Sequence, residues 1–177
     1  MKRRAALILL AGAGLTACAP PPPSVGPDGA PLPRAYKISG SDARQIPFRA
    51  LDAINALRAE AGAPQLQLDS QLTAAAETHS RDMSVQNRPW HFGSDGSSPI
   101  DRARRAGFRG RVLGEAISET YEGELETITA WMQDPGSRRV ILDRSAQVMG
   151  FGFYQESNGK IWWTANFGAA PGGAGIA

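Results

Sequence analysis

The 177-residue sequence predicts an α+β domain over residues 46–168, with a small antiparallel sheet inside a three-layer α–β–α sandwich. Three stretches carry apolar residues three or four positions apart, which is the spacing of amphipathic helices. Near the C-terminus, two apolar stretches flank Asn158-Gly159, the strongest short-range signal for a β-hairpin. Helices on both faces would bury such a sheet, and these residues suffice for one core.

The first 17 residues are typical of a secretion signal. Lys2-Arg3-Arg4 precede the apolar stretch Ala5–Gly14, which is too short for a stable transmembrane helix. Of the 19 Lys and Arg residues, three lie in this signal, which leaves 16 against 17 Asp and Glu residues in the rest of the chain. Nucleic-acid binding needs clustered basic residues, so no nucleic-acid partner is expected.

The end of this signal contains the single cysteine of the chain, Cys18. Leu15-Thr16-Ala17-Cys18 resembles the lipobox of bacterial lipoproteins. That resemblance implies cleavage before Cys18, lipid attachment to its thiol and new amino terminus, and a membrane anchor. Ala19 at the next position favours the outer membrane of the cell envelope. The alternative is an ordinary signal peptide with a chance cysteine.

Two segments beside the predicted domain have the composition of unstructured chain. Residues 18–45 hold the lipidated cysteine and seven prolines, including four in a row at Pro20 to Pro23, which favours an extended tether. Residues 169–177 are rich in Gly and Ala and are predicted to form a flexible tail.

The first two helices are predicted from their apolar stripes. Pro47 fits the first turn of a helix that ends at Gly62, and Asp69 or Ser70 caps the next helix. The two stripes are Phe48, Leu51, Ile54 and Leu57, and Leu72, Ala76, His79 and Met83. His79 therefore faces the core, which favours a hydrogen-bonded packing histidine over a catalytic one.

A short helix and a strand follow in the middle of the chain. Ser98 caps a helix that runs through Ala106, and residues 111–118 alternate as a strand does. Period two places Glu115 on one face with Leu113 and Ile117. A carboxylate between two apolar neighbours is expected to be partly buried and to have a partner. The alternative is that the opposite face of the strand packs on the core.

The C-terminal third supplies the third helix and the hairpin. Leu125, Ile128, Trp131 and Met132 form the helical stripe, and Asp134-Pro135-Gly136 ends the helix. Gly150 and Gly152 share one face of the first hairpin strand, which indicates close approach of another backbone or a ligand. Trp162 and Trp163 point to opposite faces of the second strand, so one of them could be exposed.

Many short motifs, in order, resemble the CAP superfamily, in particular its short bacterial branch without disulfides. This group is also named after sperm-coating proteins (SCP), antigen 5 and pathogenesis-related 1 proteins. The resemblance covers nearly all of residues 46–168. It implies an α–β–α sandwich with a cleft lined by two histidines and two acidic residues, which binds zinc or another divalent ion in some members. The motifs are Asn55-x-x-Arg58-x-x-x-Gly62, His79-Ser80-x-Asp82-Met83, the loop Asn87–Arg102, Gly114-Glu115, Trp131-Met132-x-Asp134-Pro135-Gly136, Val148-Met149-Gly150-Phe151-Gly152 and Trp162-Trp163-Thr164-Ala165-Asn166-Phe167-Gly168.

Four cleft positions carry over by this resemblance. His91 matches the first histidine, Glu115 matches the acid of the Gly-Glu motif, and Asp134 falls where the second acid occurs in animal members. Ser137 stands where the bacterial motif Ser-Pro-Gly-His-Arg has the second histidine. Only His91 and Glu115 then remain as weak metal candidates. Since a catalytic metal normally has three protein ligands, no metal or other cofactor is expected.

Three functions are compatible with these residues. The first is an envelope-anchored, non-enzymatic module whose degenerate cleft binds a lipid, a peptide or a cell-wall component. The second is a hydrolase of peptide or cell-wall substrates, with His91 and Glu115 acting on Ser137 as nucleophile or through a weakly held metal. A helix N-cap is favoured over a nucleophile for Ser137, since Ser is a preferred cap residue. The third is a structural or adhesion domain. The first function is favoured.

Overall fold

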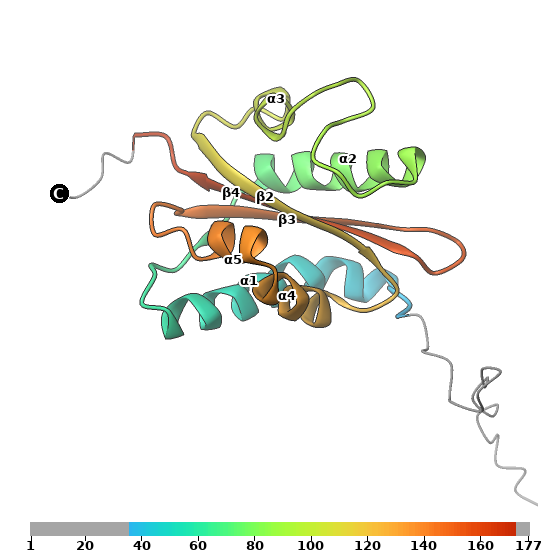
Figure 1. Cartoon of the computed structure of the whole chain (residues 1–177), viewed down its shortest axis with the longest axis horizontal. Helices are drawn as coiled ribbons and strands as arrows, with labels where there is room; N and C mark the ends of the chain where they lie inside the picture. Colours follow the sequence, from blue (N-terminus) through green and yellow to red (C-terminus); the bar gives the residue numbers. More distant parts are fainter. Residues whose placement is uncertain (1–35, 173–177) are drawn as a thin grey trace, which may run out of the picture. The chain divides into compact units, whose positions relative to one another are not determined.

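The computed structural model describes residues 36–172, so Cys18 and the predicted signal lie outside the described residues. Strands β1, β3, β4 and β2 form one sheet in that order. α2 and α3 cover one face of the sheet, and α1, α4 and α5 cover the other (Figure 1). The predicted α–β–α sandwich is therefore confirmed. The elements are α1 (Gly40–Glu60), β1 (Gln67–Leu68), α2 (Ser70–Gln86), α3 (Pro99–Arg105), β2 (Arg111–Thr120), α4 (Glu124–Gln133), α5 (Pro135–Ile141), β3 (Val148–Gln155) and β4 (Ile161–Ala169).

The sheet is antiparallel except at one edge. β4 pairs antiparallel with both β2 and β3, and the predicted hairpin joins β3 to β4. The two-residue β1 pairs parallel with β3, which makes the sheet mixed. None of the helices in residues 36–172 combines the length and the apolar composition that a membrane crossing needs.

The core on the α1 side is built on aromatic residues of the hairpin. Phe151 lies 5.7 Å from Trp163 and 6.0 Å from Trp131, measured between ring centroids. Trp162 is on the opposite face, which it shares with Thr164, whose hydroxyl accepts a hydrogen bond from Ser80 of α2. Both hairpin tryptophans are fully buried. Core packing thus holds for both, and neither is exposed, because helices cover both faces of the sheet.

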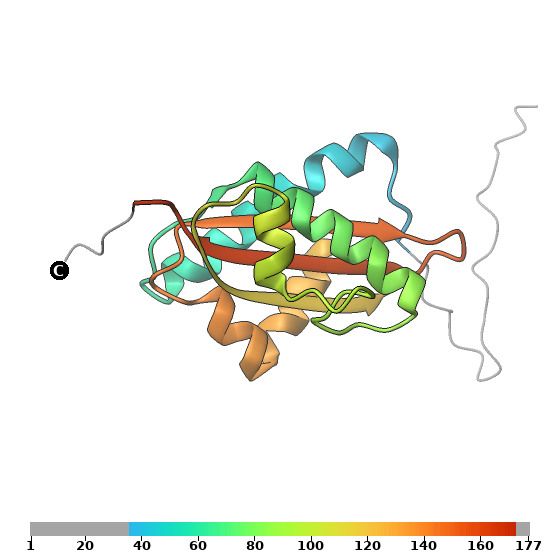
Figure 2. The same cartoon turned by 90° about the horizontal axis from the view of Figure 1, so that it is seen from above.

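On the other face, the backbone of α2 packs directly on β3. A Cβ added at Gly150 would lie 2.1 Å from the Leu72 carbonyl carbon, and one at Gly152 would lie 2.3 Å from the Glu77 nitrogen. α2 crosses the strands in the view from above (Figure 2). The prediction of close approach is confirmed, and the approaching group is the helix backbone rather than a ligand. This contact fixes the height of α2, and of His79, above the sheet.

The first helix differs from its prediction in where it starts and which face it buries. Ser39 and Asp42 form a capping box, so α1 begins at Gly40 and Pro47 lies inside it. Residues 40–45, assigned from composition to the tether, form its first turns. Phe48 is exposed. The buried residues of α1 are Ile46, Ala50, Ile54 and Arg58.

The fourth helix buries Ile128 and Trp131 as predicted and departs from the predicted stripe only in its first turn. Leu125 is exposed, while Glu124 is buried and binds Arg49 of α1, with 2.6 Å between Nε and Oε1. The first turn of α4 therefore buries the carboxylate of the ion pair with α1 and leaves Leu125 exposed. The N-caps predicted for α2 and α3 are confirmed, with Asp69 capping α2 and Ser98 capping α3.

Candidate functional site

Glu115 lies at the centre of the candidate site, on β2. A bulge between Val112 and Gly114 interrupts the alternation of this strand. Leu113 packs into the core on the α1 side, and Gly114 faces Val140 of α5. The prediction that Leu113 shares a face with Glu115 is therefore wrong. The predicted burial is confirmed, since the Glu115 side chain is 1% exposed and has charged partners.

Arg102 of α3 is the principal partner of Glu115. Its Nη2 donates to Glu115 Oε2 over 2.7 Å, and its Nη1 donates to the carbonyl oxygens of His91 and Ser97. Its side chain is 6% exposed. The capping box of Ser98 and Asp101 fixes the start of α3, and so places Arg102 one turn into the helix. One buried guanidinium thus joins β2, α3 and the loop that carries His91.

His91 lies on the outer side of Glu115. Its Nδ1 is 3.0 Å from Glu115 Oε1, and its side chain is 54% exposed. Because Nδ1 faces a carboxylate, hydrogen bonding assigns the proton of the neutral ring to Nδ1. Nε2 then carries the lone pair and has no hydrogen-bond partner within residues 36–172. The structure therefore brings His91 and Glu115 together as an oriented pair.

His79 approaches Glu115 from the inner side. It is fully buried, and its Nε2 is 3.0 Å from the Trp90 carbonyl oxygen and 3.7 Å from Glu115 Oε1. Burial lowers the pKa of His79, although the nearby Glu115 acts in the opposite direction. The prediction of a hydrogen-bonded packing histidine agrees with this position. Its closeness to Glu115 was missed, as was the role of Arg102.

Asp134 and Ser137 lie together in a different arrangement. Asp134 ends α4 and caps α5, and its Oδ2 accepts a hydrogen bond from the Ser137 backbone over 2.7 Å. Hydrogen bonds from Ser137 hold the pKa of Asp134 below its usual value. Asp134, not Ser137, is therefore the cap. Within residues 36–172, no hydrogen bond joins either residue to His91 or Glu115.

The donor set around Glu115 does not fit a metal ion. Across residues 36–172, no three His, Cys, Asp or Glu side chains gather closely enough to hold one. One oxygen of Glu115 is taken by the Arg102 cation, and His79 Nε2 is turned to a carbonyl oxygen. Imidazole and carboxylate would be suitable ligand types, but here they are bonded to protein groups instead.

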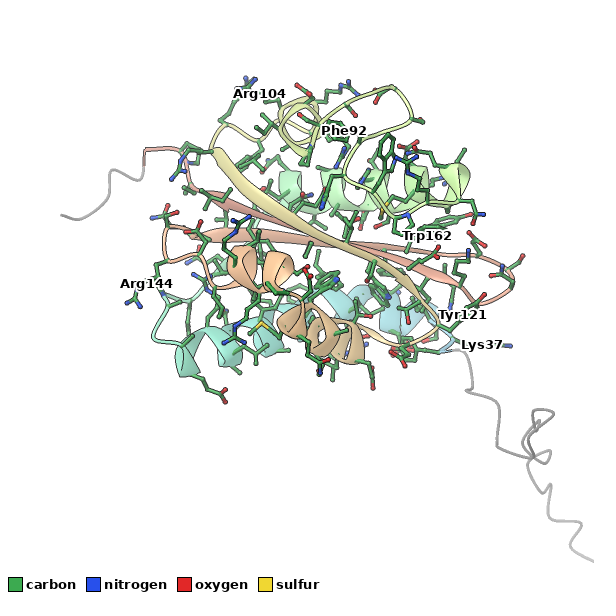
Figure 3. The ribbon with its side chains drawn as sticks, in the orientation of Figure 1. Lys37, Phe92, Arg104, Tyr121, Arg144 and Trp162 are labelled. Atoms are coloured by element: carbon green, nitrogen blue, oxygen red, sulfur yellow. The ribbon has the colours of Figure 1, made fainter. Side chains whose placement is uncertain are left out.

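Aromatic side chains flank His91 in the loop between α2 and α3. The rings of Trp90 and Phe92 lie 5.6 Å apart, and the Arg88 guanidinium stacks 3.4 Å above the Trp90 ring. Trp90 Nε1 donates to Gln86 of α2 over 2.7 Å, which holds the loop on the helix. Phe92 is 49% exposed, on the α2–α3 side of the sheet (Figure 3). The loop thus exposes both the His91 imidazole and the Phe92 ring, and the Phe92 ring packs on Trp90.

A separate hollow of about 410 Å³ lies between α2 and α3. Ala74, Thr78 and Asp82 of α2 line one side, and Arg102 and Arg105 of α3 line the other. His91 and Glu115 do not line it. Arg102 therefore separates this hollow from the His91–Glu115 pair.

Comparison with known proteins identifies relatives of the domain. The family model described as the cysteine-rich secretory protein family, CAP, matches residues 51–167. The uncharacterized protein YkwD of Bacillus subtilis is 30% identical over 114 residues, which are 64% of this chain and 44% of that protein. The uncharacterized membrane protein YlbC of the same organism is 26% identical over 71% of this chain and 36% of its own length. The chain thus spans less than half the length of these curated relatives.

Solved structures show the same fold. An extracellular protein containing an SCP domain from Bacillus anthracis matches with a TM-score of 0.62 and 24% identity, over 76% of this chain and 45% of that one. An outer surface protein from Borrelia burgdorferi matches with a TM-score of 0.65 and 16% identity, over 77% of this chain and 98% of that one. At these identities the likeness concerns the fold alone.

Proposed function

The chain belongs to the cysteine-rich secretory protein (CAP) family, in its short bacterial branch, and from this membership we propose a binding function. The domain acts as an envelope-anchored module that recognises a ligand or partner through the face around His91. It does so without catalysis. The observation that carries this proposal is the buried Glu115 that holds an exposed His91 in one orientation.

The pair offers a ligand a fixed hydrogen-bond acceptor. With Nδ1 bonded to Glu115, His91 Nε2 can accept from a hydroxyl or N–H group of a ligand. Phe92 offers an exposed apolar ring in the same loop. Sugars and peptides of the cell wall combine both features, since they present hydroxyl or amide donors next to apolar C–H surface. We therefore favour a cell-wall component over a lipid as the ligand.

The test is binding of soluble muropeptides, followed by amide chemical-shift changes and calorimetry. We expect the changes to centre on residues 90–98. His91→Ala should weaken binding by about tenfold or more, as loss of a central contact does. Arg104→Ala, on the exposed side of α3, is the matched control and should bind as the wild type does. Unchanged affinity in the His91 variant would contradict the proposal.

A hydrolase remains the second candidate because of one contact. The bond between His91 and Glu115 is the arrangement that orients a general base. However, Ser137 is held in the first turn of α5 by Asp134, and its hydroxyl does not bond to His91. We expect no turnover of ester or muropeptide substrates above background. Turnover that Ser137→Ala abolishes, with the fold intact, would establish the hydrolase instead.

The membrane anchor is proposed from the lipobox at Cys18. Relatives include one protein named as extracellular, one as an outer surface protein and one as a membrane protein, which supports a place in the envelope. We expect the full-length chain to incorporate labelled palmitate and to fractionate with the outer membrane. Cys18→Ala should do neither. Wild-type chain that stays unlabelled would contradict the anchor.

A further inference from the structure

We propose that Arg102 is a built-in cation that takes the place of a metal ion at Glu115. The CAP resemblance implies a divalent ion in this cleft in some members, whereas the donor set here does not fit one. The proposal goes beyond ligand binding and rests on contacts within the domain. Its outcome is therefore independent of which ligand, if any, His91 recognises.

Arg102 compensates the charge of the buried Glu115 carboxylate. The Glu115 side chain is 1% exposed, and a carboxylate removed from water needs a counter-charge. In a metal site the ion supplies that charge. Here Arg102 supplies it through the 2.7 Å bond from Nη2 to Oε2. A divalent ion at the same oxygen would have to displace the guanidinium or tolerate its repulsion.

Arg102 also holds the ring and the backbone of His91 in place. Metal ions hold ligand side chains in one geometry, and Arg102 does this through three bonds. It binds the Glu115 carboxylate that orients the His91 ring, and it binds the His91 carbonyl oxygen of the same residue over 3.0 Å. Its third bond goes to Ser97, whose carbonyl oxygen also accepts from the Gly93 N–H. Arg102 thus fixes both the ring and the loop of His91.

Two histidines face the same carboxylate oxygen of Glu115. His91 Nδ1 and His79 Nε2 lie 3.0 and 3.7 Å from the same oxygen of Glu115. Two imidazoles and one carboxylate are a common zinc ligand set. Removing the guanidinium would leave Glu115 Oε2 without its cation, next to the oxygen Oε1 that both imidazoles face. The wild-type chain is thus expected to be indifferent to divalent ions, and a variant without the cation is expected to acquire a site.

The experiment titrates Co²⁺ into the untagged full chain and records visible absorption, with Zn²⁺ competition for affinity. All chains carry Cys18→Ser, so that no thiol contributes. Wild type should show no ligand-field bands and no change in Tm above about 1 °C with Zn²⁺. Arg102→Met should show the bands and bind Zn²⁺ about tenfold tighter or more. Arg102→Lys keeps the charge and should resemble wild type, and His91→Ala with Arg102→Met should lose the bands.

Two results would overturn the proposal. One is a wild-type Co²⁺ spectrum that His91→Ala removes. The other is a folded Arg102→Met variant, checked by circular dichroism, that gains no metal affinity. If that variant does not fold, the nitrogen chemical shifts of His91 in the wild type decide, because Zn²⁺ should leave them unchanged. A Zn²⁺-dependent shift there would refute the built-in cation.

Discussion

The burial of single site residues could be predicted from the sequence, but their bonding partners could not. Glu115 was expected to be buried with a partner because Leu113 and Ile117 were placed on its face. The bulge moves Leu113 to the other face, yet Glu115 is buried. Its partner was not predictable, since Arg102, Arg104 and Arg105 lie close together and only the docking of α3 on β2 selects one. A signal did exist: a buried acid needs a cation, and the preceding helix supplies three.

The buried His79 makes the domain sensitive to mild acid. Burial keeps its pKa below the ordinary 6.5 in the folded state. Below pH 6.5 the unfolded chain therefore binds a proton that the folded chain does not. The free energy of unfolding should fall with decreasing pH, from about 6.5 down to the folded pKa, by up to about 1.4 kcal/mol per pH unit for this proton.

Urea denaturation at several pH values between about 7.5 and 5 measures this slope. His79→Gln should be less stable at neutral pH but should lose the dependence attributed to this residue. Carboxylates such as Asp134, with a lowered pKa, contribute only at more acidic pH. Equal slopes in wild type and variant would show that His79 is not the group responsible.

Helices and strands were predicted correctly where a short local motif determines them. Where contacts between distant elements determine the ends or the buried face of a helix, the structure differs from the prediction. The caps of α2 and α3 and the hairpin follow from short motifs, and all three are present. The burial of Ile128 and Trp131 in α4 also follows from their spacing, but the burial of Glu124 does not, because Glu124 pairs with Arg49 of a distant helix. Asp134 was expected to end a helix, and it also begins the next one. Sequence spacing does not reveal such a double role.

The contact between α2 and β3 should not tolerate a side chain. Gly150→Ala would place a methyl group 2.1 Å from the Leu72 carbonyl carbon, so the helix must move. We expect a loss of about 3 kcal/mol in the free energy of unfolding, as for other overpacked interfaces. Gly40→Ala is the control, because a Cβ there meets no atom within 4 Å. Urea denaturation of the two variants should differ clearly, and similar stabilities would argue against this close contact.

At the scale of the whole molecule, the architecture was predictable and its N-terminal boundary was not. The proline-rich composition placed the boundary after residue 45, although the chain is already attached to the sheet at Tyr36. The Tyr36 N–H donates to the Tyr121 carbonyl oxygen over 2.8 Å, and Gln155 of β3 bonds to both Tyr36 and Ile38. The amino-acid composition of a segment does not reveal single hydrogen bonds of this kind. The tether predicted from composition therefore included residues 36–45, which belong to the folded domain.

Two truncated chains test this boundary. Residues 34–172 keep the Ser39 cap and the contacts of Tyr36, whereas residues 46–172 lose both and the first turns of α1. We expect the shorter chain to melt at least about 5 °C lower in thermal denaturation. Equal Tm values would mean that the domain is complete from residue 46 onwards.

The central position of β4 has a consequence for hydrogen exchange. All nine of its residues are buried, and β2 and β3 bind its two edges. Amide protons in such a strand reach water only when the sheet separates, so their exchange rates report the free energy of global unfolding. A ligand at His91 stabilises the folded state and should slow these amides, although it touches none of them. The exchange rates of the β4 amides would thus report ligand binding at the surface loop that carries His91.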